Sequence, residues 1–94
     1  MDQHFCAVLA DVVRRFGGRV RFKLRCETEA EPWSRWLGAP SDGYIEIEGY
    51  GPSQLGELEW VEAEPEGDVE LLASALAAVG IPAAVIQDTV RVTI

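Results

Sequence analysis

Hydrophobic positions recur at the period of an α-helix in two segments of the chain. In the segment 2–16, the apolar stripe is formed by Phe5, Val8, Leu9, Val12 and Phe16. In the segment 69–79, it is formed by Val69, Leu72, Ala73, Leu76 and Val79. Asp2 and Asp68 are suited to N-cap these segments, and Gly17 and Gly80 are suited to end them. We therefore predict two amphipathic helices.

A period of two, which is typical of strands, begins directly after the first helix. Over 19–26 four basic residues alternate with four apolar ones, so one face of this strand is basic: Arg19, Arg21, Lys23 and Arg25. Weaker alternation predicts strands over 44–49 and 56–62, with Leu58 and Trp60 on one face of the latter, and a closing hairpin of 83–86 and 90–94. The segments 39–43 and 49–53 are rich in Gly, Pro, Ser and Asp and predict a turn and a loop.

A short helix is expected between the first two strands. Pro32 is suited to its first turn, Gly38 is suited to its end, and Trp33, Trp36 and Leu37 would share one face. The order of elements is then α-β-(short α)-β-β-α-β-β. We predict an α+β fold in one domain, 1–94, with a small antiparallel or mixed sheet of about five strands and two helices packed on one face.

The length and composition are those of a small globular domain. The chain has 94 residues, of which 48% are hydrophobic and 26% charged. No apolar run is long enough to cross a bilayer, and residues 1–4 lack the features of a secretory signal. The expectation is a cytoplasmic protein, in which Cys6 and Cys26 stay reduced.

Charge is unevenly distributed along the chain. Residues 1–25 carry a net charge of +4, and residues 26–94 carry −12, within a total of −8. Glu46 and Glu48 alternate at the same period as the basic strand and could lie opposite Arg21 and Lys23 in the sheet. A phosphate-binding role for the basic strand is disfavoured because the net charge repels nucleic acid.

The densest acidic cluster lies near the second helix and contains no cation. It consists of Glu57, Glu59, Glu62, Glu64, Glu66, Asp68 and Glu70. Two interpretations stay open: a solvated edge that keeps the protein dispersed, or a surface that meets a basic partner with fast, salt-sensitive association. A calcium site is disfavoured because the EF-hand spacing is absent.

The aromatic residues divide between core and surface. Trp60 is predicted in the core because it shares a face with Leu58. Trp33 and Trp36 could either cover the core or anchor an interface, where Trp is often a binding hot spot. Tyr50, between two glycines of a loop, is the best candidate for an exposed aromatic.

No residue pattern selects a reaction. His4 is the only histidine, and Cys6, two positions later, does not face it on a helix. We expect no catalytic residue, no metal site and no cofactor, because none of the motifs that hold them is present.

The leading hypothesis is a small non-catalytic protein-binding module. It would be an inhibitor or neutralising protein, of the immunity or phage anti-defence type, whose acidic surface covers a basic site on a nuclease or another nucleic-acid-handling protein. The expected partner-binding residues are Glu57, Glu59, Glu62, Glu64, Glu66, Asp68, Glu70, Trp33, Trp36 and Tyr50. Direct binding of nucleic acid or membrane is not expected. The alternatives are a homodimeric structural or regulatory subunit, in which basic and acidic surfaces of two copies attract each other, and a ligand-binding or enzymatic domain built on Trp33, Trp36 and Tyr50.

Overall fold

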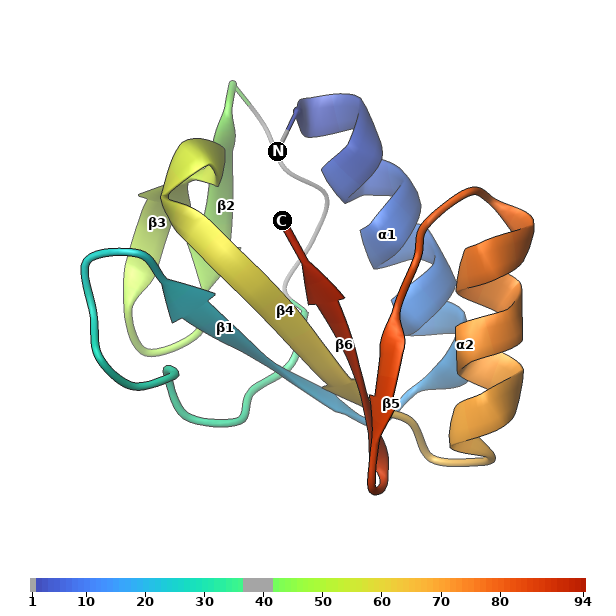
Figure 1. Ribbon diagram of the computed structural model, residues 1–94. Coiled ribbons are helices and arrows are strands. Elements are labelled where there is room, and N and C mark those ends of the chain that lie inside the picture. The colour runs from blue at the N-terminus through green and yellow to red at the C-terminus, as the bar shows by residue number, and fades with distance from the viewer. Residues whose placement is uncertain (1, 37–41) are drawn as a thin grey trace.

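Two helices cover one face of a four-stranded antiparallel sheet (Figure 1). A separate two-stranded hairpin lies at the end of the molecule away from the second of these helices. The structure is a computed structural model that describes residues 2–36 and 42–94. The helices are α1 (Gln3–Phe16) and α2 (Val69–Ala78), and the sheet has the order β1-β4-β6-β5. Its strands are β1 (Arg19–Leu24), β4 (Leu58–Glu64), β5 (Ala84–Ile86) and β6 (Thr89–Thr93). The predicted α+β class, with both helices on one face, is confirmed. The expected single sheet of about five strands is wrong, because β2 and β3 pair with each other in a separate two-stranded sheet.

The helix ends are those expected from the sequence. The Asp2 carboxylate accepts a hydrogen bond from the backbone N–H of Phe5 at 2.7 Å, and the Asp68 carboxylate accepts one from Glu70 at 2.8 Å. Gly17 and Gly80 follow the two helices with φ of 68° and 79°, a backbone conformation that favours glycine.

The core lies between the helices and the sheet. Leu9 and Val12 of α1 and Leu72 and Leu76 of α2 are buried against the inner face of the sheet. That face carries buried apolar residues from three strands: Val20, Phe22, Leu24, Leu58, Val61, Ala63, Val90 and Val92. We call the other face of the sheet the open face, because no helix of the described residues covers it (Figure 1).

The predicted short helix at residues 32–37 is wrong for the part that the structure describes. This segment is extended, and Ser34 exchanges two backbone hydrogen bonds with Val20 at 2.7 and 2.8 Å. Trp36 forms a bridge with Ile47 and places its ring against Phe22, with centroids 5.3 Å apart. The segment therefore covers the outer edge of β1, which would otherwise expose its backbone polar groups. Leu37 lies outside the described residues.

The structure contains a second strand pair, of which the sequence predicts only the first strand. β2 (Tyr44–Ile47) falls within the expected segment 44–49, but β3 (Gly51–Gln54) occupies residues expected to form a loop. Ser53 of β3 is buried opposite Ile45, so pairing with β2 outweighs the turn-like composition of this segment. A 3₁₀ turn, η1 (Leu55–Glu57), then leads into β4, which begins and ends two residues later than expected.

The prediction that Trp60 shares the core face with Leu58 is wrong. The pairing of β1 with β4 shifts register between Lys23 and Leu24, so Leu24 lies opposite Leu58 whereas Lys23 lies opposite Trp60. This β-bulge inserts one extra residue, Glu59, and reverses the alternation along β4. Leu58 and Val61 consequently face the core, and Trp60 faces outward with Glu62.

Candidate functional site

The cations of β1 are matched by carboxylates on the neighbouring strand β4. Arg19 lies opposite Glu64, and its Nε is 2.9 Å from a Glu64 oxygen. Arg21 lies opposite Glu62, with a closest N–O distance of 2.7 Å. The predicted partners Glu46 and Glu48 are wrong because β2 does not pair with β1, and Glu48 instead lies 3.5 Å from Arg35.

Glu62 is the centre of the open face. Its side chain is only 2% exposed, and its two oxygens contact two different guanidinium groups. Oε1 accepts from Nε of Arg21 at 2.7 Å, and Oε2 accepts from Nε of Arg91 at 2.9 Å. Each arginine also brings a second nitrogen to the same oxygen, at 2.7 and 2.8 Å respectively. Such charge-assisted contacts fix both arginines in place.

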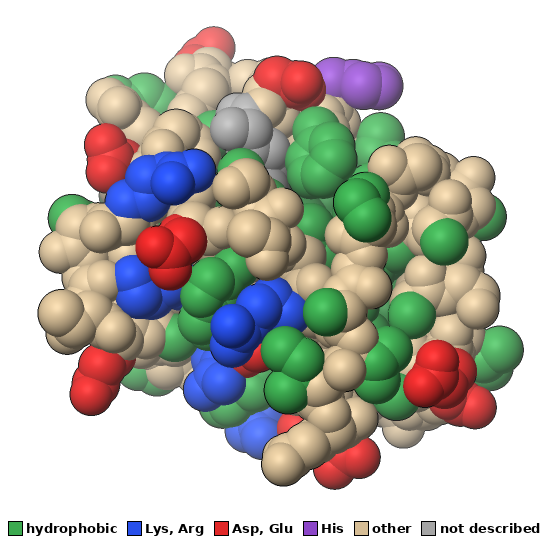
Figure 2. Space-filling view, in the orientation of Figure 1, with side chains coloured by type: hydrophobic (Ala, Val, Ile, Leu, Met, Phe, Trp, Pro, Cys, Tyr) green, Lys and Arg blue, Asp and Glu red, His purple; other side chains and the backbone are tan. Residues whose placement is uncertain are grey.

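Two tryptophans stack on these arginines. The guanidinium of Arg91 lies 4.1 Å from the ring centre of Trp60, and those of Arg19 and Arg21 lie 4.7 and 4.6 Å from that of Trp33. Figure 2 shows Lys and Arg side chains gathered over the open face, with most carboxylates around its rim. The open face therefore combines the residue types that most often dominate protein interfaces, Trp and Arg.

The acidic cluster expected at residues 57–70 is divided by the fold. Three of its members point to the open face and form ion pairs there. Glu59 pairs with Lys23, Glu62 pairs with both Arg21 and Arg91, and Glu64 pairs with Arg19. The expectation that all seven acids form one cation-free surface is therefore wrong for these three. Their positions on a strand next to the basic strand explain the pairing, and the sequence did not reveal which strands are neighbours.

Three of the remaining acids of the cluster, Glu66, Asp68 and Glu70, gather where β4 leads into α2. Glu64, Asp68 and Asp88 line a shallow hollow of about 550 Å³ between the end of β4, the first turn of α2 and the turn of the β5–β6 hairpin. Glu66 and Glu70 are exposed and adjacent in sequence to its lining. We call Glu66, Asp68, Glu70 and Asp88 the acidic corner. Asp88 was not among the expected contact residues, because only the folded hairpin brings it to this position.

The other expected contact residues do not converge on one site. Trp36 is buried and contributes to the core, whereas Trp33 lies under the arginines of the open face. Tyr50 is 48% exposed in the turn between β2 and β3, in agreement with its predicted exposure. Glu57 is exposed at the end of η1, which precedes β4, and so is separated from the acidic corner by the length of that strand.

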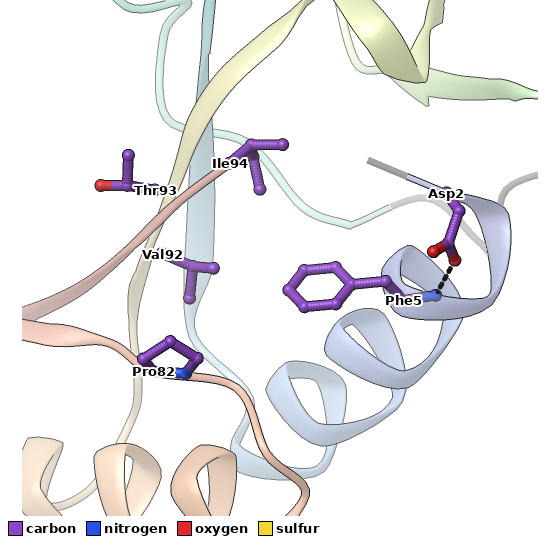
Figure 3. Close-up of a pocket in the computed structure, with 6 residues that line it drawn as sticks. All are labelled: Asp2, Phe5, Pro82, Val92, Thr93 and Ile94. Carbon is purple, nitrogen blue, oxygen red and sulfur yellow. Dashed lines mark hydrogen bonds between the residues drawn. The ribbon is translucent and has the colours of Figure 1, made fainter.

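An apolar hollow of about 380 Å³ lies between the first turn of α1 and the end of β6 (Figure 3). Phe5 projects from α1 toward Val92 and Pro82 and forms one wall. Asp2 is the titratable side chain in this lining, and its carboxylate is turned back to cap α1 (Figure 3). The hollow thus offers apolar contact and one carboxylate that already has a hydrogen-bonded role.

The two thiols lie in different environments. Cys6 is fully buried on α1, and its burial raises the pKa of the thiol to about 11, whereas Cys26 is exposed after β1. A thiol with such a raised pKa is a poor nucleophile at neutral pH. Within residues 2–36 and 42–94, no group of three or more His, Cys, Asp and Glu side chains is placed to hold a metal ion, and no helix is long and apolar enough to cross a membrane.

Comparison with known protein families, with characterised proteins and with solved structures finds no match to this chain.

Proposed function

We propose that the protein is a non-catalytic protein-binding module whose acidic surface covers a basic site on another protein. The observation that carries this proposal is the distribution of ion pairs. Among the described residues, six of the eight cations take part in ion pairs that use five of the sixteen side-chain carboxylates, and the other eleven carboxylates form no ion pair there. The positive charge is thus largely matched internally, and the charge presented to a partner is negative.

The acidic corner is the contact surface that this proposal favours. Its four carboxylates come from three parts of the fold, and none of them forms an ion pair among the described residues. A basic partner would be attracted by the field of the whole molecule and then meet this corner. A nuclease or another nucleic-acid-handling protein is the partner class we propose, because its substrate groove must be basic and carboxylates can replace phosphates there. An immunity or anti-defence protein in the cytoplasm would act in this way.

The test uses a panel of basic nucleases, with binding and inhibition measured at increasing NaCl concentration. Binding is expected to weaken steadily as salt screens the charges, by about tenfold or more between ~0.05 and ~0.3 M NaCl. The double variant Glu66→Lys/Glu70→Lys reverses two exposed charges of the acidic corner and should abolish inhibition.

The matched control is Glu29→Lys/Glu46→Lys, which makes the same change in net charge at two exposed positions outside the acidic corner. It should weaken binding only through the long-range field. Salt-independent binding, or an equal loss in both double variants, would contradict the acidic corner as the contact surface.

A further inference from the structure

The two edge strands of the four-stranded sheet differ in whether their outer backbone groups are hydrogen-bonded. The edge of β1 is covered, since Ser34 and Glu31 form backbone hydrogen bonds with Val20 and Phe22 at 2.7–2.8 Å. The other edge is β5, and no described residue pairs with its outer side. Edge strands that stay unpaired in monomers are usually very short or carry a lysine, a proline or a bulge. Ala84–Ile86 is short, with three residues, but it carries no lysine, proline or bulge.

The surroundings of β5 are the longest uncharged part of the chain. The 17 residues 71–87 contain no Asp, Glu, Lys, Arg or His, although 26% of the whole sequence is charged. Four of the six exposed large hydrophobic residues of the described chain lie here: Leu71, Val79, Val85 and Ile86. Val85 and Ile86 are each 40% exposed on the edge strand itself. An uncharged apolar edge in a strongly acidic protein indicates an interface.

The register of β5 shows which backbone groups are available. Ile86 lies opposite Thr89 and closes the two-residue turn of the hairpin, a position where the two residues exchange hydrogen bonds. Pairs alternate along an antiparallel ladder, so Val85, opposite Val90, directs its N–H and C=O to the outer edge. One residue therefore presents one donor and one acceptor.

We propose that β5 pairs antiparallel with β5 of a second copy of this chain, about a two-fold axis that passes beside Val85. In this arrangement the N–H of each Val85 donates to the C=O of the other, so the outward groups satisfy each other. The two sheets join into one with the order β1-β4-β6-β5-β5-β6-β4-β1. Apolar side chains of both edges become buried in the same step.

Charge identifies the occupant as a second copy. A basic protein is not the expected occupant, because residues 71–87 contain no carboxylate to bind its cations. Nucleic acid or anionic lipid is not expected either, because the same residues contain no cation to bind phosphate. Two copies of a chain with net charge −8 repel each other, and an uncharged surface is where that repulsion is least. Asp88, three positions after Val85, would be on the order of 20 Å from its counterpart, beyond the Debye length of about 8 Å at physiological salt.

The test is sedimentation equilibrium of the full chain over a hundredfold range of concentration that reaches hundreds of micromolar. We expect a monomer–dimer equilibrium that shifts toward dimer between ~0.02 and ~0.5 M NaCl, because salt screens the repulsion between copies. This salt dependence is opposite to that of the proposed function, so either proposal can fail without the other. Dimerisation should also slow amide hydrogen exchange at Val85 as concentration rises.

The variant Val85→Lys places two like charges across the two-fold axis and should raise the dimer dissociation constant by about tenfold or more. Thr28→Lys makes the same substitution by lysine at an exposed position in the loop after β1 and should leave dimerisation intact. A wild-type chain that stays monomeric at high salt and high concentration would overturn the proposal, and so would a Val85→Lys variant that dimerises like Thr28→Lys.

Discussion

Two neighbouring carboxyl groups, Glu27 and Glu31, lie close together in the loop after β1. Hydrogen bonding with the Glu27 side chain raises the pKa of the Glu31 carboxyl, and partial burial and the charge of Glu27 add to the rise. One oxygen of Glu27 is itself buried without a hydrogen-bond partner among the described residues. The raised pKa means that the ionised form of Glu31 is less stable in the folded chain than in the unfolded one, so ionisation of Glu31 opposes folding.

Replacement of Glu31 by glutamine should raise the thermal unfolding midpoint at neutral pH. The folded-state pKa of Glu31 lies above its unfolded value, so in the wild type the folded state is favoured as pH falls through the raised pKa and disfavoured above it. The advantage of Glu31→Gln should consequently be largest at pH 7 and shrink as the pH falls through that range. Thermal unfolding of both proteins between pH 7 and pH 4 measures this, and a constant difference would contradict the role of the pair.

At the scale of the element, Glu62 determines how β1, β4 and β6 are held on their open side. It contacts an arginine from each neighbouring strand and is almost inaccessible to solvent. Glu62→Ala should lower the free energy of unfolding by about 3 kcal/mol or more, because two partly buried guanidinium groups lose their counter-charge. Glu48→Ala, which breaks an exposed pair with Arg35, should cost less than about 1 kcal/mol. Urea denaturation of both variants gives the comparison, and equal losses would show that the burial of Glu62 adds nothing.

The open face also shows how far the sequence alone predicts the fold. Both helices, their caps and the alternating strand β1 follow from local periodicity, and the structure confirms them. The bulge at Glu59 cannot be predicted from local periodicity, because the inserted residue reverses the alternation only when β4 pairs with β1. Strand order is equally hidden in the sequence, whose alternation favours Glu46 and Glu48 as partners of β1, whereas Glu62 and Glu64 lie opposite it in the structure. Tertiary pairing also overrides the helical signal of Pro32 and Trp36, since β1 needs a partner at its edge.

At the scale of the whole molecule, ion pairs and net charge have opposite effects on the stability of the folded chain. The six ion pairs among the described residues favour the folded chain, but four of them include at least one side chain that is more than 40% exposed, where a pair contributes little. Eleven carboxylates remain outside these pairs, and folding concentrates them into a smaller volume. Net repulsion therefore outweighs the exposed attractions, and this balance decides the sign of the response to salt.

The thermal unfolding midpoint should accordingly rise with salt, by about 2–5 °C between ~0.02 and ~0.3 M NaCl. The measurement uses Val85→Lys at low concentration, so that association between copies does not contribute. Glu66→Gln/Glu70→Gln in the same background removes two charges of the acidic corner and should begin at a higher midpoint and rise less. Sodium and potassium chloride should give the same curve, because screening depends on ionic strength. A midpoint that falls as salt is added would mean that the ion pairs of the open face contribute more to stability than the acidic surface removes.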